Sequence, residues 1–120
     1  MRVSYPWGYD SGQFLPSSPL FIRPTTVQQD TSHSPLIIDV RSPLEYASGH
    51  VEGSVNLPLD RFVDGYAQLI GERSRQVVVY CASGARSGQA VQFLMAQGYS
   101  NVANGISREQ VASRLGKALV

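Results

Sequence analysis

The sequence contains one cysteine, almost no net charge and no long apolar run. The single cysteine, Cys81, excludes an internal disulfide and any zinc site built from cysteines, and we expect no metal and no cofactor. The formal net charge of +1 gives no general attraction for nucleic acid or an anionic membrane, so we expect neither as a partner. No window approaches the roughly 18 apolar residues of a membrane-spanning helix. The single thiol is therefore either an unreactive side chain packed in the core or a reactive group.

The chain of 120 residues is long enough for one domain with a stable core, and we expect a monomer. Its first residues lack the apolar core of about 7–15 residues that marks a signal peptide. We therefore expect a cytoplasmic protein, or a periplasmic one if a signal peptide has already been removed.

Residues 1–34 differ in composition from the rest of the chain. They are rich in proline and aromatic residues and show neither helical nor strand periodicity. We predict an irregular N-terminal extension here, followed by one domain over residues 35–120. Disordered tails are usually poor in aromatic residues, so part of the extension is expected to pack on the domain. The aromatic residues of this segment are Tyr5, Trp7, Tyr9, Phe14 and Phe21.

Residues 35–120 alternate short apolar runs with amphipathic segments. The runs predict strands over residues 36–40, 53–57 and 76–80, and a weaker strand over 101–103. Because helical segments separate these strands, we predict an α/β fold with a parallel sheet and helices on both faces.

Four helices are expected, three between these strands and one after the last strand. A capping box runs from Ser42 to Glu45, and Asp60 is expected to cap a helix that reaches about residue 70. The next helix is predicted over residues 89–97 and ends before Gly98. A second capping box at Ser107 opens a terminal helix with Val111, Ala112, Leu115, Ala118 and Leu119 on one face.

Residues 76–88 place the cysteine between a predicted strand and a predicted helix. The start of a helix leaves backbone N–H groups unpaired and carries the positive end of the helix dipole, which together form an anion site. Such surroundings lower the pKa of a cysteine from about 8.5 to roughly 3.5–7.5. We therefore predict that Cys81 is a nucleophilic thiolate whose covalent adduct is an anion held by backbone amides. The alternative is a cysteine packed inertly at a strand end.

The spacing between Cys81 and Arg86 separates two anion chemistries. The usual cysteine phosphatase spacing places five residues between the cysteine and the arginine that binds two phosphoryl oxygens. Here Arg86 comes one residue early and Ser87 stands in its place. The smaller ring of amides suits a single sulfur atom on the cysteine, a persulfide. A cysteine phosphatase or arsenate reductase is kept as an alternative.

Four segments together resemble the rhodanese (sulfurtransferase) family. They occur in the family order and extend over almost the whole of the predicted domain. The continuation after Ser87 is most similar to small single-domain rhodaneses of the bacterial phage-shock type. The resemblance implies the rhodanese-like fold and a sulfurtransferase that moves sulfane sulfur from thiosulfate or a similar donor to cyanide or a thiol acceptor. The four segments are residues 38–41, residues 45–46 with 49–58, residues 79–87 and residues 97–102.

The resemblance also assigns roles to single residues. Cys81 matches the catalytic nucleophile that would carry the persulfide. Arg86 matches an arginine that either faces the bound anion or ties the loop to the scaffold. We favour the scaffold, with Asp39 or Glu45 as the partner of Arg86. The loop whose amides would hold the persulfide consists of Ala82, Ser83, Gly84, Ala85, Arg86 and Ser87.

The remaining matches are expected to support the structure. Asp39, Arg41 and Glu45 lie at a strand end and in the first helix, and His50 matches a structural polar residue. Ser83 and Ser87 are both candidates for donating a hydroxyl hydrogen bond to the sulfur. Ser87 is also a candidate for capping the helix that follows.

Three departures from the family pattern bear on the substrate. Ala82 stands where many members have a second arginine, the Gly-Gly-hydrophobic stretch after the fourth strand is shortened to residues 104–106, and a tryptophan often found beyond it is absent. A second function is therefore kept open, namely a rhodanese-like module that carries sulfur or regulates a partner without efficient thiosulfate turnover. Its sulfur donor or acceptor would be a protein.

Overall fold

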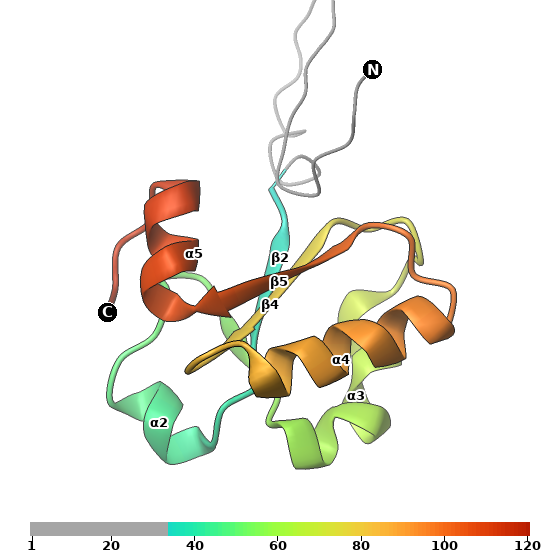
Figure 1. The fold of residues 1–120 in the computed structure, drawn as a ribbon, viewed down its shortest axis with the longest axis horizontal. Helices are drawn as coiled ribbons and strands as arrows, with labels where there is room; N and C mark the ends of the chain where they lie inside the picture. Colours follow the sequence, from blue (N-terminus) through green and yellow to red (C-terminus); the bar gives the residue numbers. More distant parts are fainter. Residues whose placement is uncertain (1–33) are drawn as a thin grey trace, which may run out of the picture.

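The computed structural model describes residues 34–120, and Figure 1 shows their arrangement. Four parallel strands form one sheet in the order β3-β2-β4-β5. The predicted α/β fold with a parallel sheet is confirmed. The extension predicted over residues 1–34 lies outside the described residues except for Ser34, so the domain boundary stays a prediction. The elements are β2 (Leu36–Asp39), α2 (Pro43–Ala47), β3 (Val55–Asn56), the 3₁₀ turn η1 (Leu59–Arg61), α3 (Phe62–Ile70), β4 (Val77–Cys81), α4 (Ala85–Ala96), β5 (Val102–Ser107) and α5 (Arg108–Leu115).

Helices cover both faces of the sheet, which explains why the central strands are apolar on both faces. In Figure 1, α5 lies to the left of the strands, and α3 and α4 lie to the right. Because side chains alternate along a strand, successive residues enter different cores. The core toward α3 and α4 contains Ile38, Val77, Val79 and Cys81 of the strands and Val40, which directly follows β2; the core toward α5 contains Ile37, Val78 and Tyr80.

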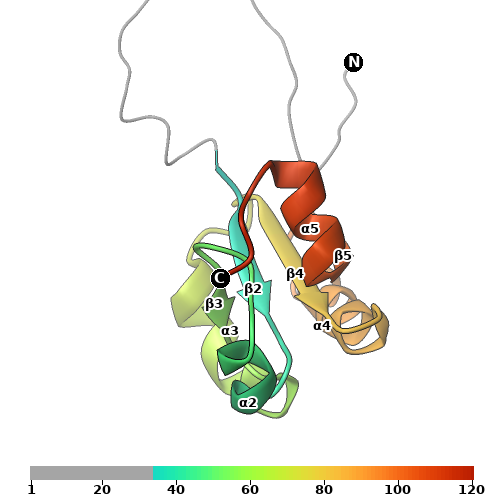
Figure 2. The same ribbon diagram turned by 90° about the vertical axis from the view of Figure 1, so that its left-hand side faces the viewer.

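The carboxyl ends of β2 and β4 meet at one edge of the sheet. Figure 2 shows both arrowheads at this edge, with α2 beyond it. The register pairs Asp39 with Tyr80, so that Cys81 extends past the end of β2. None of the helices in residues 34–120 has the length and apolar character needed to cross a bilayer.

Two helix starts differ from the prediction. The helix predicted from residue 89 begins at Ala85, because Gly84 adopts a left-handed φ of +98° and turns the chain directly from β4 into α4. Asp60 does not cap α3; it lies in η1, and α3 begins after Arg61 without a side-chain cap. In contrast, the capping box between Ser42 and Glu45 is present.

The C-terminal elements also differ from the prediction. The last strand, predicted over residues 101–103, continues to Ser107 through a bulge at Gly105, where a side chain would collide with Val111 and Val78. Helix α5 ends at Leu115, where Gly116 has a φ of +66°. Ala118 and Leu119, which were predicted to lie in this helix, therefore lie beyond its end, and Leu119 forms an antiparallel bridge with Val51.

Candidate active site

Cys81 is the last residue of β4, so it ends the strand and does not lie in the loop after it. Its exposed fraction is only 1%. The turn that follows is short, because α4 begins at Ala85 directly after Gly84. The first turn of α4 is thereby brought around the sulfur atom of Cys81.

Backbone and side-chain donors surround this sulfur. The N–H groups of Gly84 and Ser87 lie 3.1 and 3.4 Å from the Sγ atom, and the Ser87 hydroxyl lies 3.4 Å from it. Burial raises the pKa of the thiol, whereas hydrogen bonds from the backbone of Ser87, Ser83 and Gly84, and from the Ser87 hydroxyl when its proton points to the sulfur, lower it. With all of these donors directed at the sulfur the pKa is about 7, so that a large fraction of the thiol is ionised at neutral pH.

Arg86 forms a two-pronged ion pair with Glu45 of α2. Its Nη1 and Nη2 atoms lie 2.9 and 3.2 Å from the two carboxylate oxygens, and both side chains are 38% exposed. Glu45 also accepts the backbone N–H of Ser42 in the capping box. Arg86 and then Ser42 lower the pKa of Glu45 to about 2. Of the two partners expected for Arg86, the structure gives Glu45, which joins the first turn of α4 to α2.

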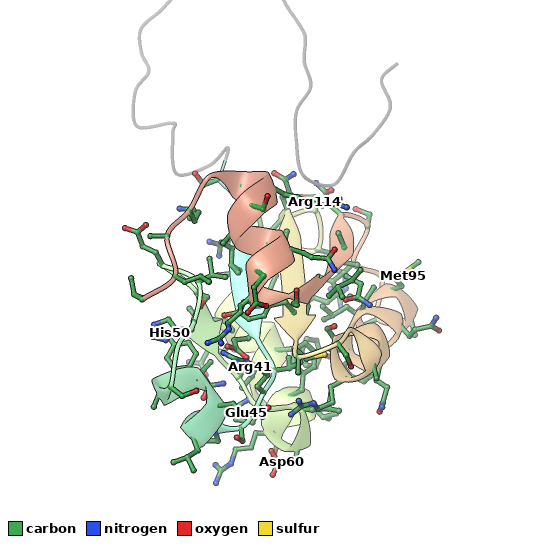
Figure 3. All side chains as sticks on the ribbon, turned by 60° about the vertical axis from the view of Figure 1, so that its left-hand side comes forward. Arg41, Glu45, His50, Asp60, Met95 and Arg114 are labelled. Atoms are coloured by element: carbon green, nitrogen blue, oxygen red, sulfur yellow. The ribbon has the colours of Figure 1, made fainter. Side chains whose placement is uncertain are left out.

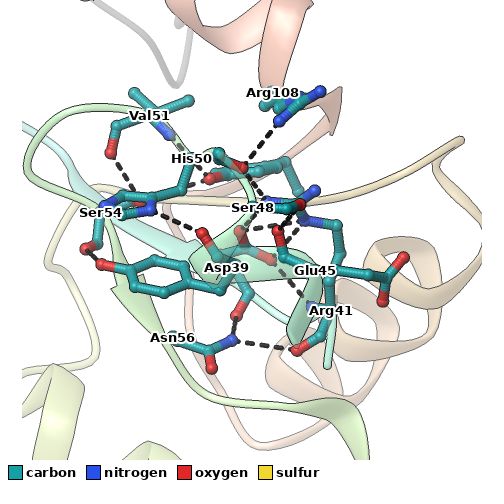
Figure 4. A network of polar contacts seen from close by, with 12 residues as sticks. Asp39, Arg41, Glu45, Ser48, His50, Val51, Ser54, Asn56 and Arg108 are labelled. Carbon is teal, nitrogen blue, oxygen red and sulfur yellow. Dashed lines mark hydrogen bonds and ion pairs between the residues drawn. The ribbon is translucent and has the colours of Figure 1, made fainter. Parts of the chain in front are cut away.

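Asp39 and Arg41 form a separate buried pair at the end of β2 (Figure 4). The Arg41 Nε atom lies 3.0 Å from both Asp39 oxygens, and its Nη2 atom lies 2.7 Å from Oδ2. Nη2 also donates to the carbonyl of Gly49 at 2.7 Å. The side-chain exposed fractions are 0% for Asp39 and 7% for Arg41. This pair therefore connects β2 to the segment after α2.

His50 packs on α2 with its ring stacked against Tyr46. The two ring centroids are 3.7 Å apart and the planes differ by 9°. The His50 Nδ1 atom also makes a 2.8 Å hydrogen bond with the Tyr46 carbonyl. Figure 3 shows His50 beside α2, on the opposite side of the view from α4, whereas Arg41 and Glu45 lie nearer the end of β4. These contacts account for His50 as part of the scaffold.

Asn104 belongs to the site but was not predicted from the sequence. Its side chain reaches from β5 to the loop, where Oδ1 accepts the Ser87 hydroxyl at 2.6 Å and Nδ2 donates to the carbonyl of Gly84 at 3.0 Å. Asn104 was predicted to lie in a shortened loop after the strand. It lies within β5, immediately before the bulge at Gly105. Only a prediction of this bulge from the sequence would have placed Asn104 near the cysteine.

A strand end, a tight turn and a helix start that surround one cysteine are the arrangement implied by the resemblance. The sequence model of the rhodanese-like domain family matches residues 24–106. The chain belongs to the rhodanese-like domain family. It is an enzyme of the rhodanese type, and the family assignment made from its sequence segments is confirmed.

Named relatives and a solved structure agree with this assignment. The chain is 37% identical over 75 residues to the thiosulfate sulfurtransferase PspE of Escherichia coli, covering 62% of this chain and 72% of that protein. It is 34% identical over 82 residues to a thiosulfate:glutathione sulfurtransferase of Saccharomyces cerevisiae, covering 58% of this chain and 59% of the yeast protein. A rhodanese structure from E. coli, described as containing anions, superposes with a TM-score of 0.65 and 33% identity over 72% of this chain and 98% of that chain.

Proposed function

We propose that this chain is a sulfurtransferase that carries sulfane sulfur as a persulfide on Cys81. The observation that carries the proposal is the convergence of the Gly84 and Ser87 N–H groups on the Sγ atom, at 3.1 and 3.4 Å. Donors in this position stabilise negative charge on sulfur, both in the attacking thiolate and in the sulfur adduct. The sulfurtransferase names of the relatives support the same chemistry.

The proposed reaction has two displacement steps on sulfur. In the first, the Cys81 thiolate attacks the outer sulfur of thiosulfate, the bond between the two thiosulfate sulfurs breaks, and sulfite leaves with the electron pair. In the second, cyanide or a thiolate attacks the outer sulfur of the persulfide. The Cys81–sulfur bond then breaks and its electron pair returns to Cys81 as the thiolate. The products are thiocyanate or a new persulfide, and the enzyme is regenerated.

A small donor fits the surroundings of the sulfur better than a protein donor. Cys81 is 1% exposed, so a donor must approach the sulfur past the residues of the tight loop. The Ala82 and Ser83 side chains that follow are small and exposed, which favours a small anion as the donor. Both relatives are named for thiosulfate as the donor, and the name of the yeast protein adds a thiol acceptor, glutathione. The monomeric state and the cytoplasmic location expected from the sequence stay predictions.

The two alternative functions have less support. A phosphatase or arsenate reductase needs a guanidinium free to bind two oxygens of its substrate, whereas the Arg86 guanidinium is bound through both nitrogens to Glu45. A purely regulatory module would not need a thiol that ionises near neutral pH, so the lowered pKa of Cys81 favours sulfur chemistry over regulation alone. A sulfur-carrying module would need the same thiolate, and the mass measurement below separates it from thiosulfate turnover.

Intact-mass measurement tests the proposal most directly. After incubation with thiosulfate we expect the protein to gain the mass of one sulfur atom, and to lose it again when cyanide is added with release of thiocyanate. Because the chain has one cysteine, Cys81→Ser is expected to abolish the adduct. An adduct that survives Cys81→Ser, or a wild-type protein that takes up no sulfur, would contradict the proposal. Sulfur uptake from a protein donor alone would favour the carrier module.

A further inference from the structure

The hydroxyl of Ser87 lies between two groups that compete for its single proton. The Asn104 Oδ1 atom lies 2.6 Å from the Ser87 oxygen, which is a short and well-formed hydrogen bond. The Cys81 sulfur lies on another side, 3.4 Å away. When the proton points to Asn104, the Ser87 oxygen presents only a lone pair to the sulfur and favours the protonated thiol. When the proton points to the sulfur, it favours the thiolate.

The backbone fixes which end of the Asn104 amide faces Ser87. The Nδ2 atom donates to the Gly84 carbonyl at 3.0 Å, and Oδ1 accepts the Ile106 N–H at 3.0 Å. Turning the amide over would place oxygen against a carbonyl and NH₂ against an N–H group. Both backbone partners therefore require the acceptor end of Asn104 to face Ser87.

The bulge in β5 makes this arrangement rigid. Ile106 has a φ of +77°, which is an unusual backbone conformation for a β-branched residue. Its N–H is held by Asn104, and its side chain lies against Gly84 of the loop. Asn104 is thereby fixed at the same time to β5, to the loop and to Ser87.

We propose that Asn104 is a positioning residue that holds the Ser87 proton away from the Cys81 sulfur and so sets the balance between thiol and thiolate. The importance of this balance for catalysis rests on the proposed sulfurtransferase function. A thiol of higher pKa is a stronger nucleophile once ionised, and a thiol of lower pKa is a better leaving group. Formation of the persulfide needs a strong nucleophile, and transfer of its outer sulfur to the acceptor needs a good leaving group. By directing the Ser87 proton, Asn104 keeps the pKa of Cys81 at a value that serves both steps.

Charged groups near the site must be kept constant in a test. The nearest are Arg86, whose charge interacts with Cys81 and with Arg41, and Glu45, which is paired with Arg86. Asp39 is bonded to Arg41. All four remain in the variants used below, so a change in the titration of Cys81 reports on Asn104 and Ser87.

The experiment measures the pH dependence of Cys81 alkylation by iodoacetamide in the full chain. The single cysteine makes the signal unambiguous. Asn104→Leu has a similar shape but no acceptor, so the Ser87 proton turns to the sulfur and the midpoint falls by about one pH unit. Asn104→Asp keeps an acceptor and adds a negative charge, so the midpoint rises. In a Ser87→Ala background, Asn104→Leu is expected to leave the midpoint almost unchanged.

Opposite shifts for Leu and Asp at one position would support the proposal, because damage to the loop would move both midpoints in the same direction. Shifts of the same sign, or an undiminished effect of Asn104→Leu in the Ser87→Ala background, would overturn it. Circular dichroism and thermal melting establish that each variant is folded. The alkylation assay does not depend on sulfur transfer. A wild-type protein that takes up no sulfur from thiosulfate would therefore contradict the proposed function and leave the role of Asn104 to be decided by the midpoints.

Discussion

β2 and β4 are neighbouring parallel strands, and each ends in a polar cluster at the same edge of the sheet. At the end of β2, the buried Asp39 carboxylate is bonded to the Arg41 guanidinium, which also donates to the Gly49 carbonyl. At the end of β4, the Gly84 and Ser87 N–H groups point at one sulfur atom. The β2 cluster contains a full opposite charge for its anion, whereas the β4 cluster stabilises an anion with backbone dipoles.

This difference separates a structural cluster from a reactive one. A buried ion pair whose two partners both belong to the protein tolerates no change in the charge of either one, because removing either partner leaves an unpaired buried charge. A sulfur held by amide dipoles can exist as thiol, thiolate or adduct, because the donors remain in place in each state. Burial and polarity alone therefore do not distinguish the candidate active site from the structural cluster. A reactive cluster needs hydrogen-bond donors that can stabilise the sulfur as thiol, thiolate and adduct.

The largest expected effect comes from breaking the β2 cluster. Asp39→Ala leaves Arg41 buried without its counter-charge, so we expect a loss of about 3–5 kcal/mol in the free energy of unfolding. That is a large share of the roughly 5–15 kcal/mol that stabilises a typical domain. Urea denaturation measures this loss. Sulfur uptake per folded molecule is expected to persist, because Asp39 makes no hydrogen bond to the loop at Cys81 among those found in residues 34–120.

A double variant provides the matched control. Asp39→Leu with Arg41→Met removes both charges and fills the space with apolar side chains, so most of the lost stability should return. An Asp39→Ala variant as stable as the wild type would show that Arg41 does not depend on Asp39 for its counter-charge. A stable Asp39→Ala protein without sulfur uptake would instead assign Asp39 to the reaction.

A smaller loss of stability is expected when His50 is replaced. His50→Gln removes the ring stacked on Tyr46 and should cost about 0.5–1.5 kcal/mol of stability. The rate of sulfur transfer and its pH profile should not change, because His50 contacts α2 and not the loop. Thermal melting and a thiocyanate assay measure the two quantities. A rate that falls by orders of magnitude in a folded variant would show that His50 takes part in proton transfer.

The sequence predicted those parts of the two clusters that depend on short-range patterns. Asp39 and Arg41 are close in the chain, and the small residues after Cys81 by themselves indicate a tight anion-binding turn. Asn104 was missed because its bond to Ser87 depends on the pairing of β4 with β5 and on a bulge. The early start of α4 was missed because a stretch of Ser, Gly and Ala resembles a loop, whereas the left-handed turn at Gly84 lets it begin a helix.

The smallest expected effect lies at the pair between Glu45 and Arg86, which joins the two sides of the site. Both side chains are 38% exposed, so solvent weakens the pair, and Glu45→Gln should cost about 0.2–1 kcal/mol at neutral pH. The folded-state pKa of Glu45 is about 2, below the ordinary value of 4.5. The stabilisation is therefore complete above the ordinary value and is lost as the pH falls toward about 2. Unfolding measured at neutral pH and at about pH 3 should show the difference between the two proteins shrinking with acid.

Arg86→Met is the matched control for this last prediction. If the two side chains act as a pair, each single variant loses the same interaction, and the double variant should be little worse than either one. Glutamine can still accept the Ser42 N–H, so Glu45→Gln leaves the capping box of α2 in place and isolates the contribution of the ion pair. Added salt should reduce the effect further, because the pair is exposed. An effect of Glu45→Gln that is as large in acid as at neutral pH would contradict a charged pair and would indicate that Glu45 acts through packing alone.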